Sequence, residues 1–586
     1  LAALPFPYAS FRSGQRALAE GVYKAAVAGR TLLAQAPTGI GKTVGTLFPL
    51  LKAMPGQSLD KIFFLTAKGS GRQLALDAAA RIQADQRPLR VLEMVAREKA
   101  CEHPDKACHG DSCPLSKGFY DRLPAARSAA LAHARLDKAA LRELALQHQV
   151  CPYYLSQELA RWCDVIVGDY NYYFDLSALL HSLAQANQWR VSVLVDEAHN
   201  LVERARAMYS AELDQASLKA LRKTAPAALT LPLSRLNRAW NALCKAQSEP
   251  YQVLPAVPEA FSSALQKATA AITEHLAEHP TEVHPALQRF YFDVLHFSRV
   301  LELFDAHSLF DVSQNGGSTT LCLRNVVPAP HLRPRFEAAR SVALFSATLS
   351  PQRFHADTLG LPEGSAWVDV PTPFSPEQLR VRLVDHISTR YQHRDASLLP
   401  LAELMARQYA AQPGNYLAFF SSYEYLQKAL ASLRAHAPGL PLWEQSRRMG
   451  EAEREEFLAR FTDDSRGIGF AVLGGSFAEG IDLPGRRLIG AFIATLGLPQ
   501  FNPVNEQMKQ RLGERFGEGC AYDYAYLFPG LQKVVQAAGR VIRTPGDRGV
   551  VCLIDDRFGQ AKVRRLLPGW WQIERTSPEA PLTSDM

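Results

Sequence analysis

Two short motifs constrain this chain more than any other feature. Residues 36–43 read Ala-Pro-Thr-Gly-Ile-Gly-Lys-Thr and fit the phosphate-loop pattern, with Ala36 where the usual pattern has its first glycine. Residues 196–199 read Asp-Glu-Ala-His and follow the apolar run 191–195, which is typical of a buried strand. The two motifs, in this order and each after a predicted strand, predict the two halves of an ATP-hydrolysing site.

Each half supplies side chains with a defined task. The loop wraps the phosphates with its backbone N–H groups, Lys42 neutralises phosphate oxygens and the Thr43 hydroxyl holds Mg²⁺. In the second motif Asp196 reaches the metal, and Glu197 orients or deprotonates the attacking water. The nucleotide-binding residues predicted from these motifs are Gly39, Gly41, Lys42, Thr43, Asp196 and Glu197.

The overall composition fits a globular chain of several domains. With 586 residues, of which 47% are hydrophobic and 21% charged, roughly three to five domains are expected. The longest nearly uncharged apolar stretch, Leu488 to Pro499, is too short to cross a bilayer, so we expect no membrane partner. The uneven cysteines indicate a site rather than a disulfide scaffold, so we expect a cytoplasmic protein. Because residue 1 is not Met, we expect a trimmed chain or part of a longer protein. The net charge of +7 permits nucleic-acid binding without showing it.

Further motifs follow along the chain. A Ser/Thr turn at 346–350 follows a strand-like run, and a Gly-rich loop at 475–485 contains two carboxylates, one of them Asp482. Near the end of the chain, Arg540 follows Gln536 by four residues and Arg543 follows Arg540 by three. This spacing places the three side chains on one face of a helix. Such arginines suit the γ-phosphate, whose transition state requires a guanidinium from outside the loop.

The ordered set resembles superfamily 2 helicases, and within them the DinG/XPD-like branch that contains an iron–sulfur cluster. The matching segments are motif I (36–43), Ia (65–73), II (196–199), III (346–350), IV (419–423), V (475–485) and VI (536–543), with the upstream Q motif (11–15) and an "NY" signature (169–173). The resemblance implies an α/β fold of two RecA-like lobes with ATP between them. The implied domains are lobe 1 (1–95, 159–199 and 333–377), an iron–sulfur domain (96–158), a helical arch (200–332) and lobe 2 (378–586).

The resemblance also implies roles for single residues. Gln15 would read the adenine, and Asp482 would contribute to the nucleotide site. Arg540 and Arg543 would reach across from lobe 2, with Arg543 favoured for the γ-phosphate and Gln536 beside them. Hydrolysis would then open and close the cleft once per ATP.

Four of the nine cysteines are gathered between residues 101 and 151. Three candidate ligands lie close together in the chain, Cys101, Cys108 and Cys113, and the fourth, Cys151, lies further along it. Thiolates suit either an Fe–S cluster or zinc. His103 and His109 lie among them and would suit zinc. The resemblance favours a [4Fe–4S] cluster held by the four cysteines. In this segment we also expect a helix capped by Asp137, within the Ala/Leu-rich run 125–149.

The motor would require a grip on a nucleic-acid strand. Candidates for weak contacts are Lys68, Arg72, Tyr170, Tyr172 and Tyr173. The resemblance implies 5′→3′ movement on single-stranded DNA and unwinding of forked duplexes, although the residues do not discriminate DNA from RNA. A monomer is expected. Alternatives are a single-strand translocase, the motor part of a longer nuclease–helicase, and a redox-sensing scaffold with weak ATPase activity, which the intact ATP motifs argue against.

Overall fold

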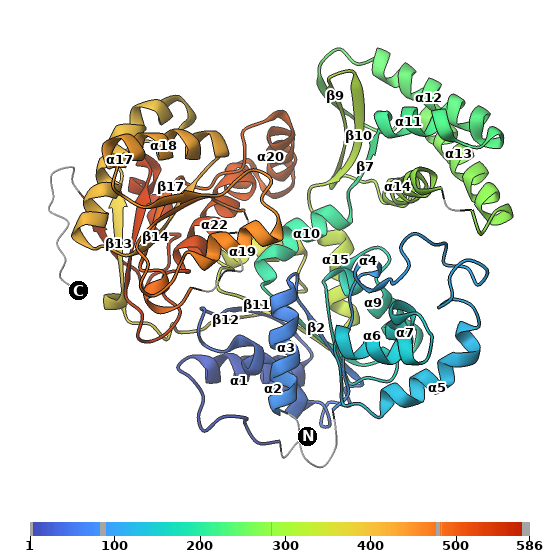
Figure 1. The fold of residues 1–586 in the computed structure, drawn as a ribbon, viewed down its shortest axis with the longest axis horizontal. Coiled ribbons are helices and arrows are strands. Elements are labelled where there is room, and N and C mark those ends of the chain that lie inside the picture. Colours follow the sequence, from blue (N-terminus) through green and yellow to red (C-terminus); the bar gives the residue numbers. More distant parts are fainter. Residues whose placement is uncertain are drawn as a thin grey trace.

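The computed structural model describes residues 4–82, 89–282, 284–475, 477, 481 and 483–576. Two α/β lobes lie side by side, with two insertions beside lobe 1 (Figure 1). Lobe 1 is blue at the bottom of the view, lobe 2 is orange to red on the left, and the insertions are cyan and green on the right. The predicted α/β fold with two parallel-sheet lobes is therefore confirmed.

Lobe 1 is built on an eight-stranded parallel sheet. Its order is β12 (Ala366–Asp369), β1 (Thr31–Gln35), β11 (Ser341–Ser346), β6 (Val191–Asp196), β2 (Lys61–Leu65), β5 (Val165–Gly168), β3 (Val91–Glu93) and β4 (Arg135–Leu136). Strands with both faces covered read as continuous apolar runs, which is why β1, β2, β5, β6 and β11 could be predicted. The short strand β3 and the edge strands β4 and β12 were missed.

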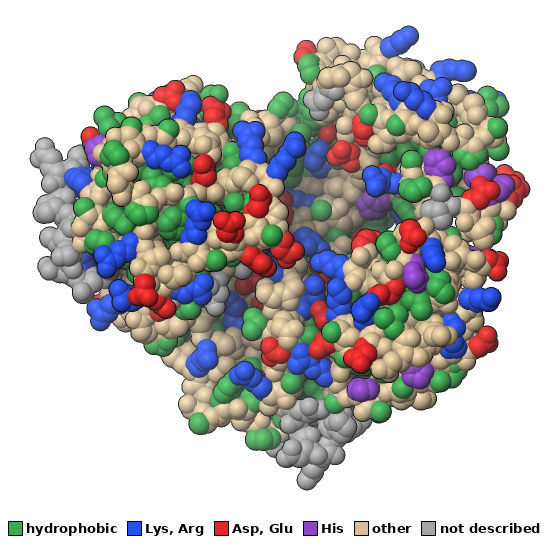
Figure 2. Space-filling view, in the orientation of Figure 1, with side chains coloured by type: hydrophobic (Ala, Val, Ile, Leu, Met, Phe, Trp, Pro, Cys, Tyr) green, Lys and Arg blue, Asp and Glu red, His purple; other side chains and the backbone are tan. Residues whose placement is uncertain are grey.

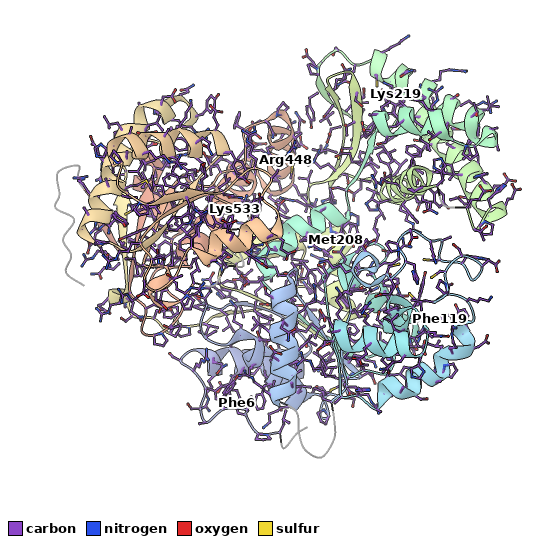
Figure 3. The ribbon with its side chains drawn as sticks, viewed as in Figure 1. Phe6, Phe119, Met208, Lys219, Arg448 and Lys533 are labelled. Carbon is purple, nitrogen blue, oxygen red and sulfur yellow. The ribbon has the colours of Figure 1, made fainter. Side chains whose placement is uncertain are left out.

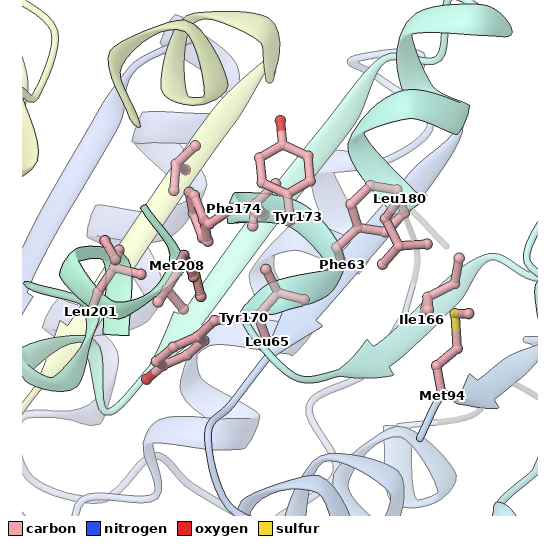
Figure 4. Close-up of a cluster of buried hydrophobic side chains, with 14 of the residues drawn as sticks. Phe63, Leu65, Met94, Ile166, Tyr170, Tyr173, Phe174, Leu180, Leu201 and Met208 are labelled. Carbon is pink, nitrogen blue, oxygen red and sulfur yellow. The ribbon is translucent and has the colours of Figure 1, made fainter. Parts of the chain in front are cut away.

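The core of lobe 1 lies on both faces of its sheet. Along β2, Phe63 and Leu65 point into one cluster of buried side chains, while Ile62 and Phe64 point into the other. Figure 4 shows the first cluster, which also contains Tyr170. The helices of this lobe are α1 (Gln15–Ala28), α2 (Lys42–Ala53), α3 (Gly69–Ile82), α8 (Asn171–Phe174), α9 (Leu179–Ala186), α10 (Leu201–Met208), α15 (Ala329–Ala338) and α16 (Gln352–Leu359).

The cysteine-bearing segment is a small helical body beside β3 and β5. Its helices are α4 (Arg97–Ala100), α5 (Phe119–Leu131), α6 (Lys138–Gln147) and α7 (Pro152–Leu159). The side chain of Asp137 accepts a hydrogen bond from the Ala140 N–H at 3.0 Å, which confirms the predicted cap of α6. Residues 101–118, which carry three of the four cysteines, form turns rather than a regular element.

The second insertion combines helices with a sheet. Its helices are α11 (Gln215–Thr224), α12 (Thr230–Lys245), α13 (Glu259–Glu278) and α14 (Pro285–Glu302). The prediction of a mostly helical segment missed a four-stranded antiparallel sheet, in the order β7 (Ala211–Asp214), β10 (Ser318–Asn325), β9 (Ser308–Asn315) and β8 (Tyr251–Leu254). Residues facing the helices alternate with polar ones along β9 and β10, so neither strand shows a continuous apolar run.

Lobe 2 repeats the architecture of lobe 1 with a seven-stranded parallel sheet. Its order is β15 (Leu442–Glu444), β16 (Gly467–Val472), β14 (Asn415–Phe420), β17 (Gly490–Ala494), β18 (Gly549–Ile554), β13 (Leu379–Val384) and β19 (Gln572–Arg575). The helices are α17 (Arg394–Ala411), α18 (Tyr423–His436), α19 (Glu451–Ala459), α20 (Pro503–Phe516), α21 (Glu518–Tyr522), α22 (Phe528–Ala538) and α23 (Ala561–Arg564), with a π-helix at Asp523–Leu527.

The two lobes touch through an aromatic contact. The Tyr524 ring of the π-helix packs edge-on against Phe354 of α16, with ring centroids 5.2 Å apart. The Tyr524 hydroxyl also donates a hydrogen bond to Asp357 Oδ2 at 2.7 Å. Since Tyr524 and Leu512 of lobe 2 belong to the same buried cluster as the lobe 1 side chains, the lobes share part of one core. None of the described helices combines the length and the apolar character that crossing a membrane requires.

Candidate ATP site between the lobes

The phosphate loop connects β1 to α2 at the carboxyl edge of the lobe 1 sheet. Gly39 and Gly41 have φ angles of 82° and 76°, a left-handed conformation that side chains rarely tolerate. A Cβ on Gly41 would lie 2.5 Å from Gln15 Nε2, so a side chain would also clash. Lys42 begins α2, and its ammonium donates to the Ala36 carbonyl at 3.4 Å, which folds it back over the loop.

Two side chains from the preceding segment brace the loop. Arg12 Nη1 donates to the Gly39 carbonyl at 2.9 Å, and Gln15 Nε2 donates to the Gly41 carbonyl at 3.0 Å. Gln15 Oε1 accepts from the Arg12 backbone N–H at 3.0 Å. Both ends of the buried Gln15 amide are therefore engaged within the protein, whereas Arg12 was not singled out from the sequence.

The second half of the site begins where β6 ends. Asp196 is the last residue of β6, and Glu197 has a φ angle of 50°, a left-handed conformation that is uncommon for a residue with a side chain. The Tyr170 hydroxyl donates to the carbonyl groups of both residues, at 2.9 Å for Glu197. The constrained turn is thus held by a fully buried tyrosine, consistent with backbone strain stored at a functional site.

The two adjacent carboxyl groups have opposite pKa shifts. Burial, together with the neighbouring Glu197 charge, raises the pKa of Asp196 to about 7. Burial also acts to raise the pKa of Glu197, but Lys42 and a hydrogen bond from His199 outweigh it and hold that pKa well below its ordinary range. Glu197 is therefore the more acidic member of the pair, which suits a residue that orients or deprotonates water.

A hydrogen-bond network fixes the Glu197 carboxylate. Ser346 Oγ, at the end of β11, lies 2.6 Å from His199 Nδ1 and donates to Glu197 Oε2 at 3.3 Å. Since β11 pairs directly with β6, motifs II and III meet at one sheet edge. Across the cleft, Gln536 Nε2 of α22 donates to Thr348 Oγ1 at 3.1 Å. This bond joins lobe 2 to the turn after β11.

Lobe 2 presents the two predicted arginines on the far wall of the cleft. Arg540 Nη1 and Arg543 Nη2 donate to the Ile481 carbonyl at 3.2 and 2.9 Å. Asp547 accepts from the Arg543 N–H at 2.7 Å and fixes the turn that carries it. Sequence reasoning missed Asp547; its signal is an acidic residue in the Pro-Gly turn after the arginines. Asp482 lies outside the described residues.

Together the motifs line a cleft of about 760 Å³ between the lobes. Its walls include Thr38, Glu197 and Thr348 of lobe 1, and Gln536, Arg540 and Arg543 of lobe 2. A Cβ on Gly39 would lie 3.0 Å from the Arg543 carbonyl and 2.9 Å from the Phe374 ring, so lobe 2 lies directly over the phosphate loop. Lys68, predicted as a weak DNA contact, also lines this cleft.

The aromatic candidates for DNA stacking are corrected by the structure. Tyr170 and Tyr173 are fully buried in the core of lobe 1 (Figure 4). The Tyr172 hydroxyl donates to the Val95 carbonyl at 2.8 Å. Arg72 is also buried, with its Nε 3.1 Å from Glu93 Oε1. The buried rings of Tyr170 and Tyr173 are not available to stack on a base in this structure, because these tyrosines serve packing and backbone support. The contact of Arg72 with DNA stays a prediction, which its ion pair with Glu93 does not test.

The four predicted metal ligands lie in one body but are not assembled. Cys101, Cys108, Cys113 and Cys151 are free thiols, and Cys108 is exposed. Burial raises the pKa of the Cys151 thiol, and Cys101 and Cys108 make smaller contributions in the same direction. Among the described residues, no group of three or more His, Cys, Asp or Glu side chains has metal-binding geometry.

Comparison with known protein families matches two segments of the chain. Residues 74–218 match the DEAD_2 family, and residues 405–574 match the helicase C-terminal domain family. The first segment contains Asp196 and Glu197, and the second contains Gln536, Arg540 and Arg543.

Individual relatives and solved structures agree with these matches. The chain is 21% identical to the "ATP-dependent DNA helicase XPD" of Sulfolobus acidocaldarius, over 89% of this chain and 92% of that protein. It is 29% identical to a "probable ATP-dependent helicase" of Methanocaldococcus jannaschii, over 42% of this chain but only 39% of that protein. A solved XPD helicase has a similar fold, with a TM-score of 0.67 over 97% of this chain and all of the other, at 17% identity.

Proposed function

Because the chain belongs to the XPD/DinG/Rad3-type superfamily 2 helicases, we propose that it is an ATP-dependent DNA helicase. The observation that carries this proposal is the cleft, in which loop, carboxylate and arginine motifs from two lobes converge. The printed names of two relatives support DNA as the substrate: "ATP-dependent DNA helicase XPD" of Sulfolobus acidocaldarius and "General transcription and DNA repair factor IIH helicase subunit XPD" of Dictyostelium discoideum.

In the proposed mechanism, ATP lies between the lobes with its phosphates in the loop. The backbone N–H groups around Gly39 and Gly41 and the Lys42 ammonium would bind the phosphate oxygens. The Thr43 hydroxyl and the Asp196 carboxylate would hold Mg²⁺, which would neutralise phosphate charge when bound. The oxygen chemistry of these two ligands fits that ion, and a bound cation would offset the burial that raises the pKa of Asp196.

Hydrolysis would depend on Glu197 and on the arginines of lobe 2. The Glu197 carboxylate, held by Ser346 and His199, would orient the attacking water and accept its proton. Arg540 and Arg543 would stabilise charge on the γ-phosphate. Since these arginines and the Gln536–Thr348 bond join lobe 2 to the nucleotide, loss of the γ-phosphate would loosen the closed cleft.

The cysteine body would hold a [4Fe–4S] cluster. Four thiols on neighbouring segments supply the donor set that such a cluster uses, and no disulfide engages any of them. When bound, the cluster would tie the turns at 101–118 to the start of α7, where Cys151 precedes Pro152. Judged by ligand chemistry alone, four thiolates would suit zinc as well.

We expect movement in the 5′→3′ direction on single-stranded DNA, and unwinding of forked duplexes. The test is unwinding of fluorophore-labelled duplexes with a 5′ or a 3′ single-stranded tail, with ATP and Mg²⁺, on protein purified without air. Opening of the 5′-tailed duplex alone supports both activity and direction. If neither duplex opens although single-stranded DNA stimulates ATP hydrolysis, the protein is a translocase rather than a helicase.

A further inference from the structure

One long helix of lobe 2 runs along the lobe 1 segment that contains motif III. The backbone stays helical from α21, through the π-helix at Asp523–Leu527, to the end of α22, and we call this element helix 518–538. Lys533, labelled in Figure 3, lies in its second half. The lobe 1 segment consists of the motif III turn at 346–350 and α16, which follows it directly.

Helix 518–538 and this segment run in opposite directions and touch at both ends. At the ATP cleft, the end of the helix meets the motif III turn through the bond from Gln536 to Thr348, 3.1 Å long. At the other end, the Tyr524 ring packs edge-on against Phe354, and its hydroxyl donates to Asp357 Oδ2 at 2.7 Å. Gln536 follows Tyr524 by twelve residues, which is about 18 Å along an α-helix.

The π-helix brings both contacts onto one face. Each residue of a regular α-helix turns by about 100°, so two residues twelve apart lie about 120° apart around its axis. A π turn accommodates one extra residue, which removes about 100° of this difference and leaves about 20°. Tyr524 and Gln536 therefore face the same lobe 1 segment, which a regular α-helix of the same length would not allow.

The contact at Tyr524 is buried and well defined. Tyr524 is 3% exposed, and burial, followed by its hydrogen bond to Asp357, raises its pKa, so the phenol keeps the proton that it donates. Arg353 Nε lies 3.3 Å from the same carboxylate oxygen and helps to fix it on α16. The hydrogen bond thus joins a buried group of lobe 2 to a carboxylate held by lobe 1.

Open space lies between the two contacts. A pocket of about 440 Å³ is lined by Phe354 and Gln536, one from each contact, and by Gln532 and Lys533 between them on the helix. On the face shown in Figure 2, the surface is also hollowed between lobe 2 and the second insertion. Because empty space supplies no packing partners, the position of the helix on lobe 1 depends on the contacts at its ends.

Both elements lead into the ATP site. Arg540 follows the end of α22 by two residues, and its charge contributes to the low pKa of Glu197. On the lobe 1 side, Ser346 begins the motif III turn and donates to Glu197 Oε2 at 3.3 Å. The alignment of helix 518–538 on the lobe 1 segment therefore decides where the arginine lies relative to the carboxylate.

We propose that Tyr524 is a positioning residue for ATP hydrolysis, which aligns helix 518–538 on α16 so that Gln536 and Arg540 face the nucleotide. Tyr524 acts through these residues and does not itself line the ATP cleft. The assignment deepens the proposed function and rests on its ATP site. Since Arg12 and Gln15 brace the phosphate loop within lobe 1, loss of the alignment should lower kcat and leave the KM for ATP unchanged.

The test measures kcat and KM for ATP on the whole protein, with single-stranded DNA in excess. Tyr524→Phe keeps the ring and removes the hydroxyl; it should lower kcat about fivefold and change the KM less than about twofold. In a Gln536→Ala background the same change should lower kcat less than about twofold, because the two contacts act as one unit. Asp357→Asn keeps an oxygen that accepts the hydrogen bond and should retain at least about half of kcat.

The matched control is Tyr526→Phe. Tyr526 lies in the same π-helix and is 1% exposed, but its hydroxyl donates to Glu506 Oε1 at 2.7 Å within lobe 2. This variant should lose about as much thermal stability as Tyr524→Phe and keep the kcat of the unmodified protein.

Three results would overturn the positioning role: unchanged kcat in Tyr524→Phe, an equal fall in Tyr526→Phe, or a full fivefold loss in the Gln536→Ala background. In each case ATP hydrolysis by the unmodified protein would still support the proposed function. If the unmodified protein does not hydrolyse ATP, the proposed function and the positioning role fail together.

Discussion

The phosphate-loop half of the ATP cleft and the four-cysteine body are both attached to the lobe 1 sheet, yet the polypeptide fixes them to very different degrees. The loop is held by hydrogen bonds from Arg12 and Gln15, and its glycines already have the required left-handed conformation. The cysteines lie on turns at 101–118 and on the first turn of α7, with no metal-binding geometry among the described residues.

The difference follows from what each ligand demands. A phosphate is recognised by backbone N–H groups, which a strand, a loop and a helix position as they fold. The helices of the cysteine-bearing segment pack into the lobe 1 core, whereas the turns at 101–118 carry three of the four cysteines. Binding of a cluster or metal ion is coupled to folding, so these turns would be ordered by it. We therefore expect the ATP half-site to survive metal loss, and the cysteine body to depend on it.

The largest expected effect is on ATP hydrolysis, through Lys42. Lys42→Ala should abolish phosphate release, because no other loop side chain neutralises the phosphate oxygens. It should leave single-strand binding and the melting temperature nearly unchanged, since the loop is braced by Arg12 and Gln15 rather than by Lys42. The measurement is phosphate release with and without single-stranded DNA. Lys52→Ala, in the same helix, is the control, and normal turnover in Lys42→Ala would contradict the site.

On the lobe 2 side of the cleft, the two arginines differ in what holds them. The Arg540 charge contributes to the low pKa of Glu197, whereas the turn that carries Arg543 is fixed by Asp547. Although the sequence favoured Arg543 for the γ-phosphate, we now expect Arg540→Ala to cause the larger fall in kcat, of about 10³. Steady-state ATPase assays measure kcat for Arg540→Ala and Arg543→Ala. The control is Arg548→Ala, because Arg548 is exposed. A larger fall in Arg543→Ala would restore the original assignment.

Much of this site could be predicted from the sequence because its parts are local in the chain. A phosphate loop must follow a buried strand and begin a helix, and such strands are visible as apolar runs at 31–35 and 191–196. Hydrogen-bond partners that are far apart in the chain and meet only in the folded protein could not be predicted from the sequence. The bond from Ser346 to Glu197 depends on β11 lying beside β6, and the support from Tyr170 depends on the packing of the core.

Loss of one cysteine ligand in the segment 96–158 should affect unwinding more than ATP hydrolysis. Cys113→Ser should lower iron and acid-labile sulfide per chain and reduce unwinding at least tenfold, while ATP hydrolysis by the lobes falls less than about threefold. Metal analysis and unwinding assays on the same preparation measure both. Cys244→Ser, on α12 of the second insertion, should match the unmodified protein. Full iron with full unwinding would refute the ligand role, and stoichiometric zinc would replace the cluster assignment.

The smallest effect separates two roles for Gln15. If its amide mainly holds the loop, through Gly41 and Arg12, Gln15→Ala should raise the KM for ATP and for GTP by the same factor, about tenfold, and lower stability by about 1–2 kcal/mol. If the amide turns outward to read adenine when nucleotide binds, only the KM for ATP should rise. Steady-state kinetics with both nucleotides distinguish these cases, with the exposed neighbour Arg16→Ala as control. Because both ends of the amide are engaged within the protein, we expect equal factors, and a selective loss for ATP would show that the loop holds its shape without Gln15.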